Sequence, residues 1–387
     1  MKKAALFAIM IFFFLAGCKD EPSKNTALIE GHLNLIDRNY LILEEMDIKR
    51  IHKLDTLQIK NGRFNLEFPL KEASIFLLRD GEVHYLPMII KPGDKIEIKG
   101  SSFADVESFN LSGSPQSLVL KKYEARFRQN QAYADSLIRI LRSIGDQAVM
   151  MQKRQETQPL YDSIVEDQEE FAKKLVKENP GTLAALFLLN QRFGQTNFFD
   201  IEQEPEYFYM VDSALMKNLP ANKHSIDHHI RMASYENKKK ADAEAAVRLA
   251  IGKKAPELSL PDTSGNVIPL QSFRGKNTLI FFWAAMDVLA RKAVNDLHKF
   301  YQEHKDENFE VYAISLDKNE SMWKGAIRLD QLNWVNVADL GGLKTPTARL
   351  FNIPDLNYFV LLDPQGRIQY KGKDLSKLKE LLRKNKK

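Results

Sequence analysis

The chain of 387 residues contains a single cysteine, Cys18. One thiol cannot close a disulfide within a chain, so the fold must be held together by packing and hydrogen bonds alone. Hydrophobic residues make up 44% of the sequence and supply enough apolar side chains for well-packed cores. Because one core seldom organises so many residues, the length predicts two or three domains.

The N-terminal segment has the pattern of a secretory signal. Lys2 and Lys3 precede an apolar run from Ala4 to Leu15, and small residues follow that run. The run is shorter than the ~20 residues that a helix needs to span a bilayer. We therefore predict that residues 1–17 form a signal peptide and that the mature chain is exported.

The four residues Leu15-Ala16-Gly17-Cys18 resemble the lipobox of bacterial lipoproteins. The resemblance implies that Cys18 becomes the acylated first residue of the mature chain, and several acyl chains together give durable anchoring. We expect a lipid-anchored protein of the cell envelope, held at the outer membrane on its periplasmic face or at the cell surface. An ordinary signal peptide with an unrelated cysteine is the alternative.

Residues 18–27 are predicted to form a tether. The run Lys19-Asp20-Glu21 resembles export signals that carry some Gram-negative lipoproteins to the outer leaflet. A solvated linker, rich in disorder-prone residues, is the alternative interpretation of the same run.

The charge of the chain does not indicate a nucleic-acid-binding protein. The formal net charge is +5, and loss of Lys2 and Lys3 with the signal lowers it to +3. Basic residues gather only in a short C-terminal tail, Arg383 to Lys387, which has no interleaved aromatic residues. We therefore expect no nucleic acid among the partners.

Residues 28–114 have the pattern of a β-rich domain. Hydrophobic and polar residues alternate on both sides of Asn61-Gly62, and this dipeptide between alternating hydrophobics favours a hairpin. A two-residue loop pairs Ile59 with Phe64 and Leu57 with Leu66. Further turns are marked by Asp80-Gly81 and by Pro92-Gly93-Asp94. Together these features predict a small antiparallel sandwich or barrel.

Residues 115–250 change to helical periodicity. The run Asn179 to Thr182 interrupts one helix, and the next, Leu183 to Leu189, is apolar enough to predict burial. His224 and His228 are four residues apart with Asp227 beside them, a spacing that suits a metal. Histidines on a charged helix are more often solvated, and no third ligand is evident, so no metal site is predicted.

Residues 251–387 resemble the TlpA/ResA-like proteins of the thioredoxin fold. The resemblance rests on the order and spacing of several runs: Gly252 to Pro256, Thr278 to Trp283, Phe309 to Leu316 and Phe359 to Asp363. It implies a thioredoxin-like α/β domain and, in active relatives, thiol–disulfide or antioxidant activity. The preceding β-rich region resembles the β-domain of unknown function that often comes before such domains in envelope lipoproteins. The resemblance includes the turn Lys91 to Asp94 and the run Leu111 to Ser114.

The two positions of the catalytic thiols are occupied by other residues. Active relatives carry Trp-Ala-x-x-Cys-x-x-Cys, with the attacking thiol at a helix N-terminus that favours the thiolate. Counting from Trp283 places Asp287 at the attacking position and Ala290 at the resolving position. A carboxylate and a methyl group cannot exchange disulfides. We predict that Asp287 is a helix cap or first-turn acid; a nucleophile or base of another chemistry is the alternative.

A second landmark of the family is also missing. Active relatives place a cis-proline four residues before the Leu-Ile-Asp run of the closing strand, and the corresponding count from Leu361-Leu362-Asp363 reaches Asn357. A cis bond before a residue other than proline costs ~2.5–4 kcal/mol. We therefore expect a trans peptide and a reshaped loop at Asn357.

The sequence thus predicts an α+β multidomain protein: an N-terminal antiparallel β sandwich or barrel, a helical middle and a C-terminal thioredoxin-like α/β domain. We expect a non-catalytic protein that binds a protein partner or acts as a scaffold, without cofactor. Binding of a glycan or small ligand by the β-domain is the alternative, and no residue pattern supports an unrelated enzyme. The candidate binding surface comprises Met286, Val288, Leu289 and Asn357, and packing of the first three under a rearranged loop is the alternative.

Overall fold

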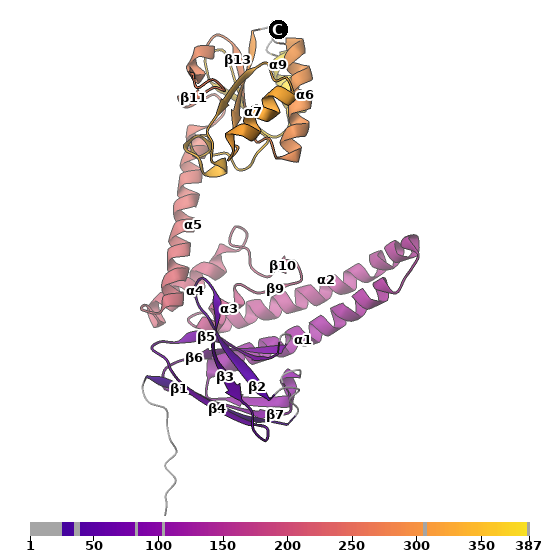
Figure 1. The fold of residues 1–387 in the computed structure, drawn as a ribbon, viewed down its shortest axis with the longest axis vertical. Coiled ribbons are helices and arrows are strands. Elements are labelled where there is room, and N and C mark those ends of the chain that lie inside the picture. Colours follow the sequence, from indigo (N-terminus) through magenta and orange to yellow (C-terminus); the bar gives the residue numbers. More distant parts are fainter. Residues whose placement is uncertain (1–24, 35–38, 82–83, 103–104, 305–307, 385–387) are drawn as a thin grey trace, which may run out of the picture. The chain divides into compact units, whose positions relative to one another are not determined.

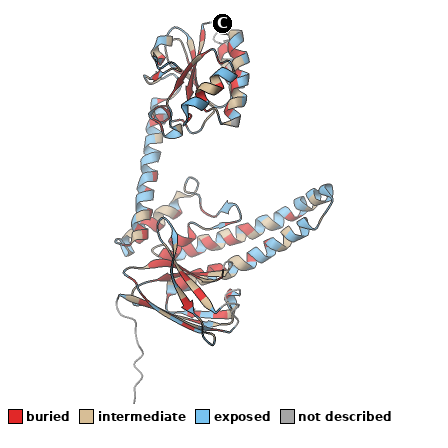
Figure 2. Ribbon diagram, in the orientation of Figure 1, coloured by how far each residue is buried: buried red, intermediate tan, exposed pale blue. Residues whose placement is uncertain are grey.

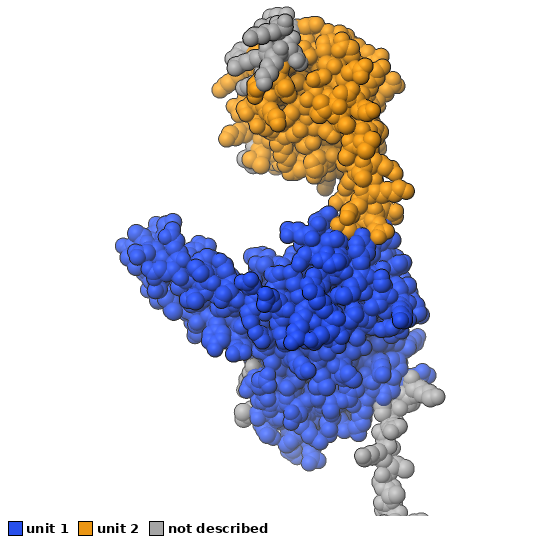
Figure 3. Space-filling model, turned by 180° about the vertical axis from the view of Figure 1, so that it is seen from behind, with its two compact units in different colours: residues 1–234 blue, residues 235–387 orange. Residues whose placement is uncertain are grey.

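The computed structural model describes residues 25–34, 39–81, 84–102, 105–304 and 308–384. The predicted signal peptide, Cys18 and most of the predicted tether lie outside these residues. The chain divides into two compact units, Met1–Ser234 and Tyr235–Lys387 (Figure 3). Among the described residues, no helix combines the length and apolar character needed to cross a membrane.

Unit 1 begins with two four-stranded sheets packed face to face (Figure 1). The first has the order β4-β1-β7-β8 and the second the order β3-β2-β5-β6. In chain order the strands are β1 (Thr26–Leu33), β2 (Tyr40–Met46), β3 (Ile51–Gln58), β4 (Arg63–Pro69), β5 (Ser74–Asp80), β6 (His84–Ile90), β7 (Lys95–Gly100) and β8 (Phe109–Ser112). All neighbours pair antiparallel except β1 and β7, which are parallel. The predicted β sandwich is confirmed.

The hairpin predicted around Asn61-Gly62 is wrong in its register. Both residues have positive φ, and Lys60 and Arg63 exchange two backbone hydrogen bonds of 2.9 and 3.0 Å. The turn is therefore formed, but β3 continues in the second sheet and β4 in the first. Leu57 and Leu66 do not pair. The alternating hydrophobic residues enter one core from opposite sheets, so the turn is a corner of the sandwich.

Strands β5 and β6 of the second sheet are buried on both of their faces, whereas most of β3 is exposed. Along β5, alternate side chains enter different cores: Phe76 and Leu78 pack against the first sheet, whereas Ile75 packs against the helices. This double burial explains a nearly continuous apolar run in place of the alternation expected of a half-exposed strand. Unit 1 is thus built of three layers, two sheets and a helical layer (Figure 2).

The helical layer starts with a long antiparallel hairpin of α1 (Pro115–Arg142) and α2 (Gln147–Glu178). The predicted interruption near Asn179 and the buried helix after it are confirmed: α3 (Leu183–Leu188) is wholly buried, and the Thr182 hydroxyl caps it by accepting a hydrogen bond from the Ala185 N–H at 3.2 Å. The remaining elements are η1 (Val106–Ser108), β9 (Arg192–Phe193), β10 (Thr196–Asn197), α4 (Pro205–Asn218) and α5 (Lys223–Arg248).

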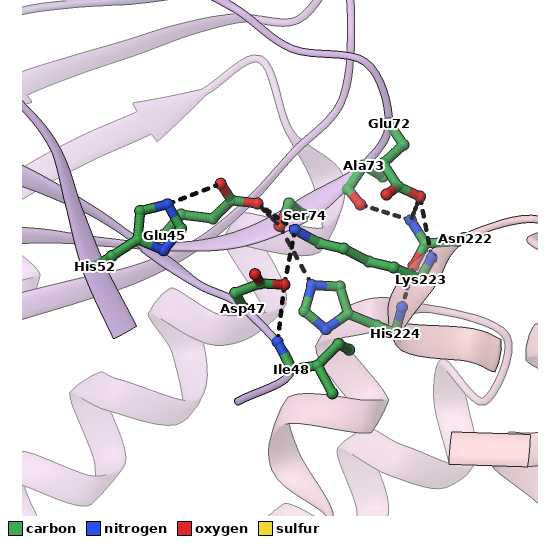
Figure 4. A network of polar contacts seen from close by, with 10 residues as sticks. All are labelled: Glu45, Asp47, Ile48, His52, Glu72, Ala73, Ser74, Asn222, Lys223 and His224. Carbon is green, nitrogen blue, oxygen red and sulfur yellow. Dashed lines mark hydrogen bonds and ion pairs between the residues drawn. The ribbon is translucent and has the colours of Figure 1, made fainter. Parts of the chain in front are cut away.

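A partly buried polar network ties the first turn of α5 to the second sheet (Figure 4). The Lys223 ammonium donates to Glu45 at 2.6 Å and pairs with Asp47 at 3.2 Å. The Ser74 hydroxyl donates to Glu45 at 2.7 Å and lies 3.2 Å from Nε2 of His224. Since the hydroxyl proton is directed at Glu45, the Ser74 oxygen accepts a hydrogen bond from the Nε2–H of His224.

The expectation that His224 and His228 are solvated is wrong. Both side chains are buried, because the first turns of α5 pack against the second sheet and α4. His224 contacts Ser74, while His228 lies 3.2 Å from the Phe208 carbonyl oxygen. The two imidazoles are therefore bound to different elements. Burial, with the charge of Lys223 adding to it, lowers the pKa of His224.

Unit 2 contains a five-stranded sheet with the order β15-β14-β13-β16-β17 (Figure 1). The first three strands are parallel, and β16 and β17 are antiparallel to their neighbours. Its elements are β11 (Ser259–Pro261), β12 (Val267–Pro269), η2 (Leu270–Phe273), β13 (Asn277–Trp283), α6 (Val288–His304), β14 (Phe309–Ser315), α7 (Glu320–Leu329), β15 (Val335–Ala338), η3 (Gly342–Lys344), α8 (Pro346–Leu350), β16 (Tyr358–Leu362), β17 (Ile368–Gly372) and α9 (Leu375–Lys384).

Each face of this sheet has its own core. One core holds side chains of α6, α7 and α9, and the other holds side chains from the β11–β12 hairpin, α8 and the end of α5. The central strand β13 sends Leu279, Phe281 and Trp283 into the first core and Ile280 and Phe282 into the second. The predicted C-terminal α/β domain with buried central strands is confirmed.

The buried neutral His224 predicts a pH-dependent stability of unit 1. Because its pKa is lower in the folded state, the unfolded chain binds the extra proton as pH falls below about 6.5, and folding stability is lost there. His224→Gln should therefore reduce the stability lost between about pH 7.5 and 5.5. The measurement is urea unfolding followed by far-ultraviolet circular dichroism, because all three tryptophans of the chain belong to unit 2.

The matched control is His32→Gln, since His32 is exposed in the folded chain. Glu124 titrates in the same window with the opposite sign, because burial raises its pKa to about 7. The relevant quantity is therefore the difference between variant and wild type in the unfolding free energy lost over this pH range. Equal losses in wild type and His224→Gln would contradict the assignment.

Candidate functional site

The candidate site lies at the carboxyl ends of the parallel strands β13 and β14. After β13, the loop at Ala285 is held by a buried carboxylate: the Ala285 N–H lies 3.0 Å from both oxygens of Asp317, which follows β14. The Ser315 hydroxyl donates to the same carboxylate at 2.8 Å, and the Asp317 N–H returns a hydrogen bond of 3.1 Å to Ser315. These bonds lock the two loops together. The sequence analysis assigned no role to Asp317.

The residue at the attacking position is a helix cap. Oδ1 of Asp287, immediately before α6, accepts a hydrogen bond from the Ala290 N–H at 2.6 Å. This is the N-cap arrangement, in which a side-chain oxygen satisfies a free N–H of the first turn and a negative charge meets the positive end of the helix. The predicted capping role is confirmed. Ala290, at the resolving position, is fully buried and offers only a methyl group to the core.

Asn357, at the proline position, has a left-handed backbone with φ of 59°. All peptide bonds of the described residues are trans, as predicted for this loop. Asparagine tolerates this conformation better than most residues, whereas the proline ring fixes φ near −65°. The loop at Asn357 is therefore shaped in a way that a proline cannot adopt.

Two polar atoms beside the site have no hydrogen-bond partner among the described residues. Nε1 of Trp283 and Oδ1 of Asn357 are both buried. The last β13–β16 pair joins Phe282 to Tyr358, so the next position of this register places Trp283 opposite Asn357. Buried polar atoms are nearly always paired with protein or water, so these two atoms are exceptions to that rule at one end of the sheet.

Apolar side chains are exposed in front of this loop. Met286 is 70% exposed and Leu289 is 66% exposed, whereas the side chain of Val288 lies outside the described part of the chain. Asn357, the fourth predicted surface residue, is half-buried. Two of the predicted surface residues are thus placed in solvent at the start of α6.

Three further exposed apolar residues follow the neighbouring parallel strands. Met322 lies in the first turn of α7, after β14, while Leu340 and Leu343 follow β15. The carboxyl ends of parallel strands meet at one edge of a sheet, which is where α/β folds bind ligands. We call Met286, Leu289, Met322, Leu340 and Leu343 the apolar edge. The sequence analysis missed the last three, although each closely follows a predictable strand.

A separate cleft of about 930 Å³ lies in unit 1 between the two sheets. Charged and polar residues line it together with the buried ring of Phe64, including Glu30, His32, Arg63, Glu97 and Lys99. The described residues contain no group of three or more His, Cys, Asp or Glu side chains arranged to hold a metal ion. The cleft therefore offers ionic and hydrogen-bonding groups to a ligand.

Residues 251–371 match the family model described as "AhpC/TSA family", and residues 28–119 match "Domain of unknown function (DUF4369)". The C-terminal segment is a thioredoxin-like AhpC/TSA domain. The thiol-disulfide oxidoreductase ResA of Bacillus thuringiensis subsp. konkukian (strain 97-27) is 26% identical over 140 residues, which are 35% of this chain and 79% of the relative. The ResA protein of Bacillus cereus (strain ATCC 10987 / NRS 248) matches to the same extent.

Two solved structures are also similar to the AhpC/TSA domain. The thioredoxin domain of a thiol-disulfide oxidoreductase from Bacteroides vulgatus has 33% sequence identity and a TM-score of 0.33, covering 35% of this chain and 97% of that one. A thiol-disulfide oxidoreductase from Bacteroides fragilis NCTC 9343 has 36% identity and a TM-score of 0.31, covering 33% and 99%. These names describe the relatives. The AhpC/TSA domain of this chain contains no cysteine at all.

Removal of the buried carboxylate should loosen the site and destabilise unit 2. Asp317→Ala leaves the Ala285 N–H and the Ser315 hydroxyl without their acceptor, at a cost of about 2–4 kcal/mol in the free energy of unfolding. Urea unfolding followed by tryptophan fluorescence measures this loss in unit 2 alone. The exposed neighbour Lys318→Ala is the control and should change stability by less than about 0.5 kcal/mol. Equal stability of the two variants would refute the role of Asp317.

The left-handed backbone at Asn357 predicts opposite outcomes for two substitutions. Asn357→Gly should keep the unfolding free energy within about 1 kcal/mol, because glycine adopts positive φ freely. Asn357→Pro should destabilise unit 2 by about 3 kcal/mol or more, because the loop must change its conformation. Both are measured by the fluorescence-detected unfolding described above. A proline variant as stable as the glycine variant would show that the loop adapts freely.

Proposed function

We propose that the AhpC/TSA domain is a redox-dead binding module that holds a protein partner at its apolar edge. This proposal rests on one observation: the residues at both former thiol positions have structural roles. The Asp287 carboxylate caps α6, and Ala290 is packed in the core. Neither residue supplies a sulfur atom for disulfide exchange, so the domain keeps the fold of its relatives without their chemistry.

The apolar edge suits a protein surface. Exposed apolar side chains that gather at one end of a sheet mark interaction sites, and burial of each contributes roughly 25 cal/mol per Å² removed from water. Two of the five residues, Met286 and Met322, are methionines, whose flexible thioethers adapt to irregular surfaces. The hydrogen bonds of Asp317 fix the loop that presents Met286, so the partner meets a largely preformed surface.

We further propose that the chain acts at the cell envelope, as a scaffold or accessory subunit anchored through acylated Cys18. The support is the sequence Leu15-Ala16-Gly17-Cys18 and the apolar run before it. Placement at the outer membrane rests on the residues that follow the cysteine. An anchor of this kind would concentrate the chain at a surface and raise the frequency of its encounters with envelope partners.

A second candidate function is ligand binding by the β-sandwich. The cleft of about 930 Å³ in unit 1 favours it, because charged side chains such as Arg63 and Glu97 line the cleft. A glycan or another polar small molecule would suit these groups. Stabilisation of unit 1 by members of a glycan panel, read as a rise in its thermal unfolding temperature, would support this candidate.

The partner proposal is tested by crosslinking the lipidated protein in its native envelope, followed by purification and mass spectrometry. The double variant Met286→Ser, Leu289→Ser should lose a partner that the wild type retains. Leu329→Ser is the matched control, because Leu329 is 76% exposed at the far end of α7 and outside the apolar edge. It should retain the partner.

Two outcomes would overturn the proposal: no reproducible partner of the wild type, or a partner retained by the double variant.

The same envelope preparations test the lipid anchor. Cys18→Ser should move the chain out of the membrane fraction and abolish incorporation of a labelled fatty acid. A variant that still carries the label would refute acylation at Cys18.

A further inference from the structure

The outer part of the α1–α2 hairpin leaves an apolar seam in contact with solvent. Its inner part packs on the core of unit 1, which includes Ala134 and Val165 (Figure 2). Between residues 135 and 156 no side chain is fully buried. In this outer part the two helices pack against each other, and no other described element of unit 1 covers them (Figure 1).

A groove of about 440 Å³ runs between the helices in this outer part. Its walls are mainly apolar and come from both helices: Leu137, Ile138 and Leu141 from α1, and Met150 and Tyr161 from α2. Thr157 is the buried residue of the lining, and its hydroxyl is directed at the Lys153 carbonyl of its own helix at 3.0 Å. The groove thus presents hydrocarbon and has a volume suited to a small ligand.

Two arginines stand at the rim of this groove. Arg142 ends α1 and Arg154 lies on the facing part of α2; both are exposed, and neither guanidinium forms an ion pair with any residue that the structure describes. The nearby acids have other tasks. Asp146 caps α2 by accepting from the Ala148 and Val149 N–H groups, and Glu156 pairs with Lys153 at 2.9 Å.

We propose that this groove binds a free long-chain fatty acid, with the hydrocarbon tail along the apolar seam and the carboxylate on Arg142 and Arg154. Charge complementarity decides the head group, because guanidinium groups form strong, often bidentate hydrogen bonds with carboxylates. The apolar lining favours a hydrocarbon tail, because burial against the leucine, isoleucine and methionine side chains removes both the tail and the groove lining from water. The site is independent of the AhpC/TSA domain and of its proposed partner.

The test is isothermal titration calorimetry of the chain carrying Cys18→Ser, purified without detergent, with decanoate below its micelle concentration. Decanoate should bind with one site per chain. Acetate, which lacks the tail, and decyltrimethylammonium, which carries the opposite charge on a tail of equal length, should not bind. Arg142→Gln, Arg154→Gln should weaken decanoate binding at least tenfold, since both charged hydrogen bonds are lost.

Arg139→Gln is the matched control, because Arg139 is exposed on the same helix but does not line the groove. It should keep the affinity for decanoate within about twofold, and circular dichroism should show unchanged helix content in all variants. Three results would overturn the proposal: no decanoate binding, equal binding of decanoate and the cationic amphiphile, or equal affinity in the wild type and the double arginine variant. Binding to phosphatidylglycerol vesicles without binding to decanoate would also overturn it and identify a membrane surface as the source of the anion.

Discussion

Burial of β13 on both faces is the constraint on which the C-terminal unit depends. The side chains of Thr278 to Trp283 all lie within cores, and parallel and antiparallel partners flank the strand on either side. A strand so enclosed has almost no freedom to shift, and neither has the loop that leaves its carboxyl end. The buried Asp317 then fixes that loop against the end of β14. The positions of Met286 and Leu289 follow from these two restraints, because α6 begins where the fixed loop ends.

The Asp287 carboxylate gives the N-terminal end of α6 a structural role. In a thiol enzyme, the positive end of the helix lowers the pKa of a cysteine and so makes it reactive. In this domain the positive end of α6 faces the Asp287 carboxylate, which stabilises the first turn of the helix. The positive end of α6 therefore contributes to the stability of the domain.

The sequence predicted most of the C-terminal unit because its signals are local. Buried strands such as Thr278 to Trp283 stand out as apolar runs, and the capping role of Asp287 follows from its place before a helix. The register near Asn61-Gly62 was mispredicted for a physical reason: alternating residues show that two strands share a core, and they do so equally when the strands lie in opposite sheets. The turn is local, but the choice of sheet depends on partners elsewhere in the chain.

Burial of His224 was mispredicted for a related reason. Lys223 and Asp227 beside it on α5 are charged, and Ser74, which contacts it, comes from a strand 150 residues earlier. The apolar edge has the same character, since only the parallel arrangement of β13, β14 and β15 brings Met322 and Leu340 to the edge that holds Met286. A pattern along the chain does not predict properties that arise only when several distant segments come together.

The left-handed backbone at Asn357 has a consequence for any attempt to install thiol chemistry in this domain. A site of the TlpA/ResA type would require two cysteines and a proline. The Asp287 carboxylate caps α6, Ala290 is fully buried, and the backbone at Asn357 has a φ that proline cannot adopt. Engineering of such a site would therefore have to replace the cap of α6 and rebuild the loop at residue 357 together.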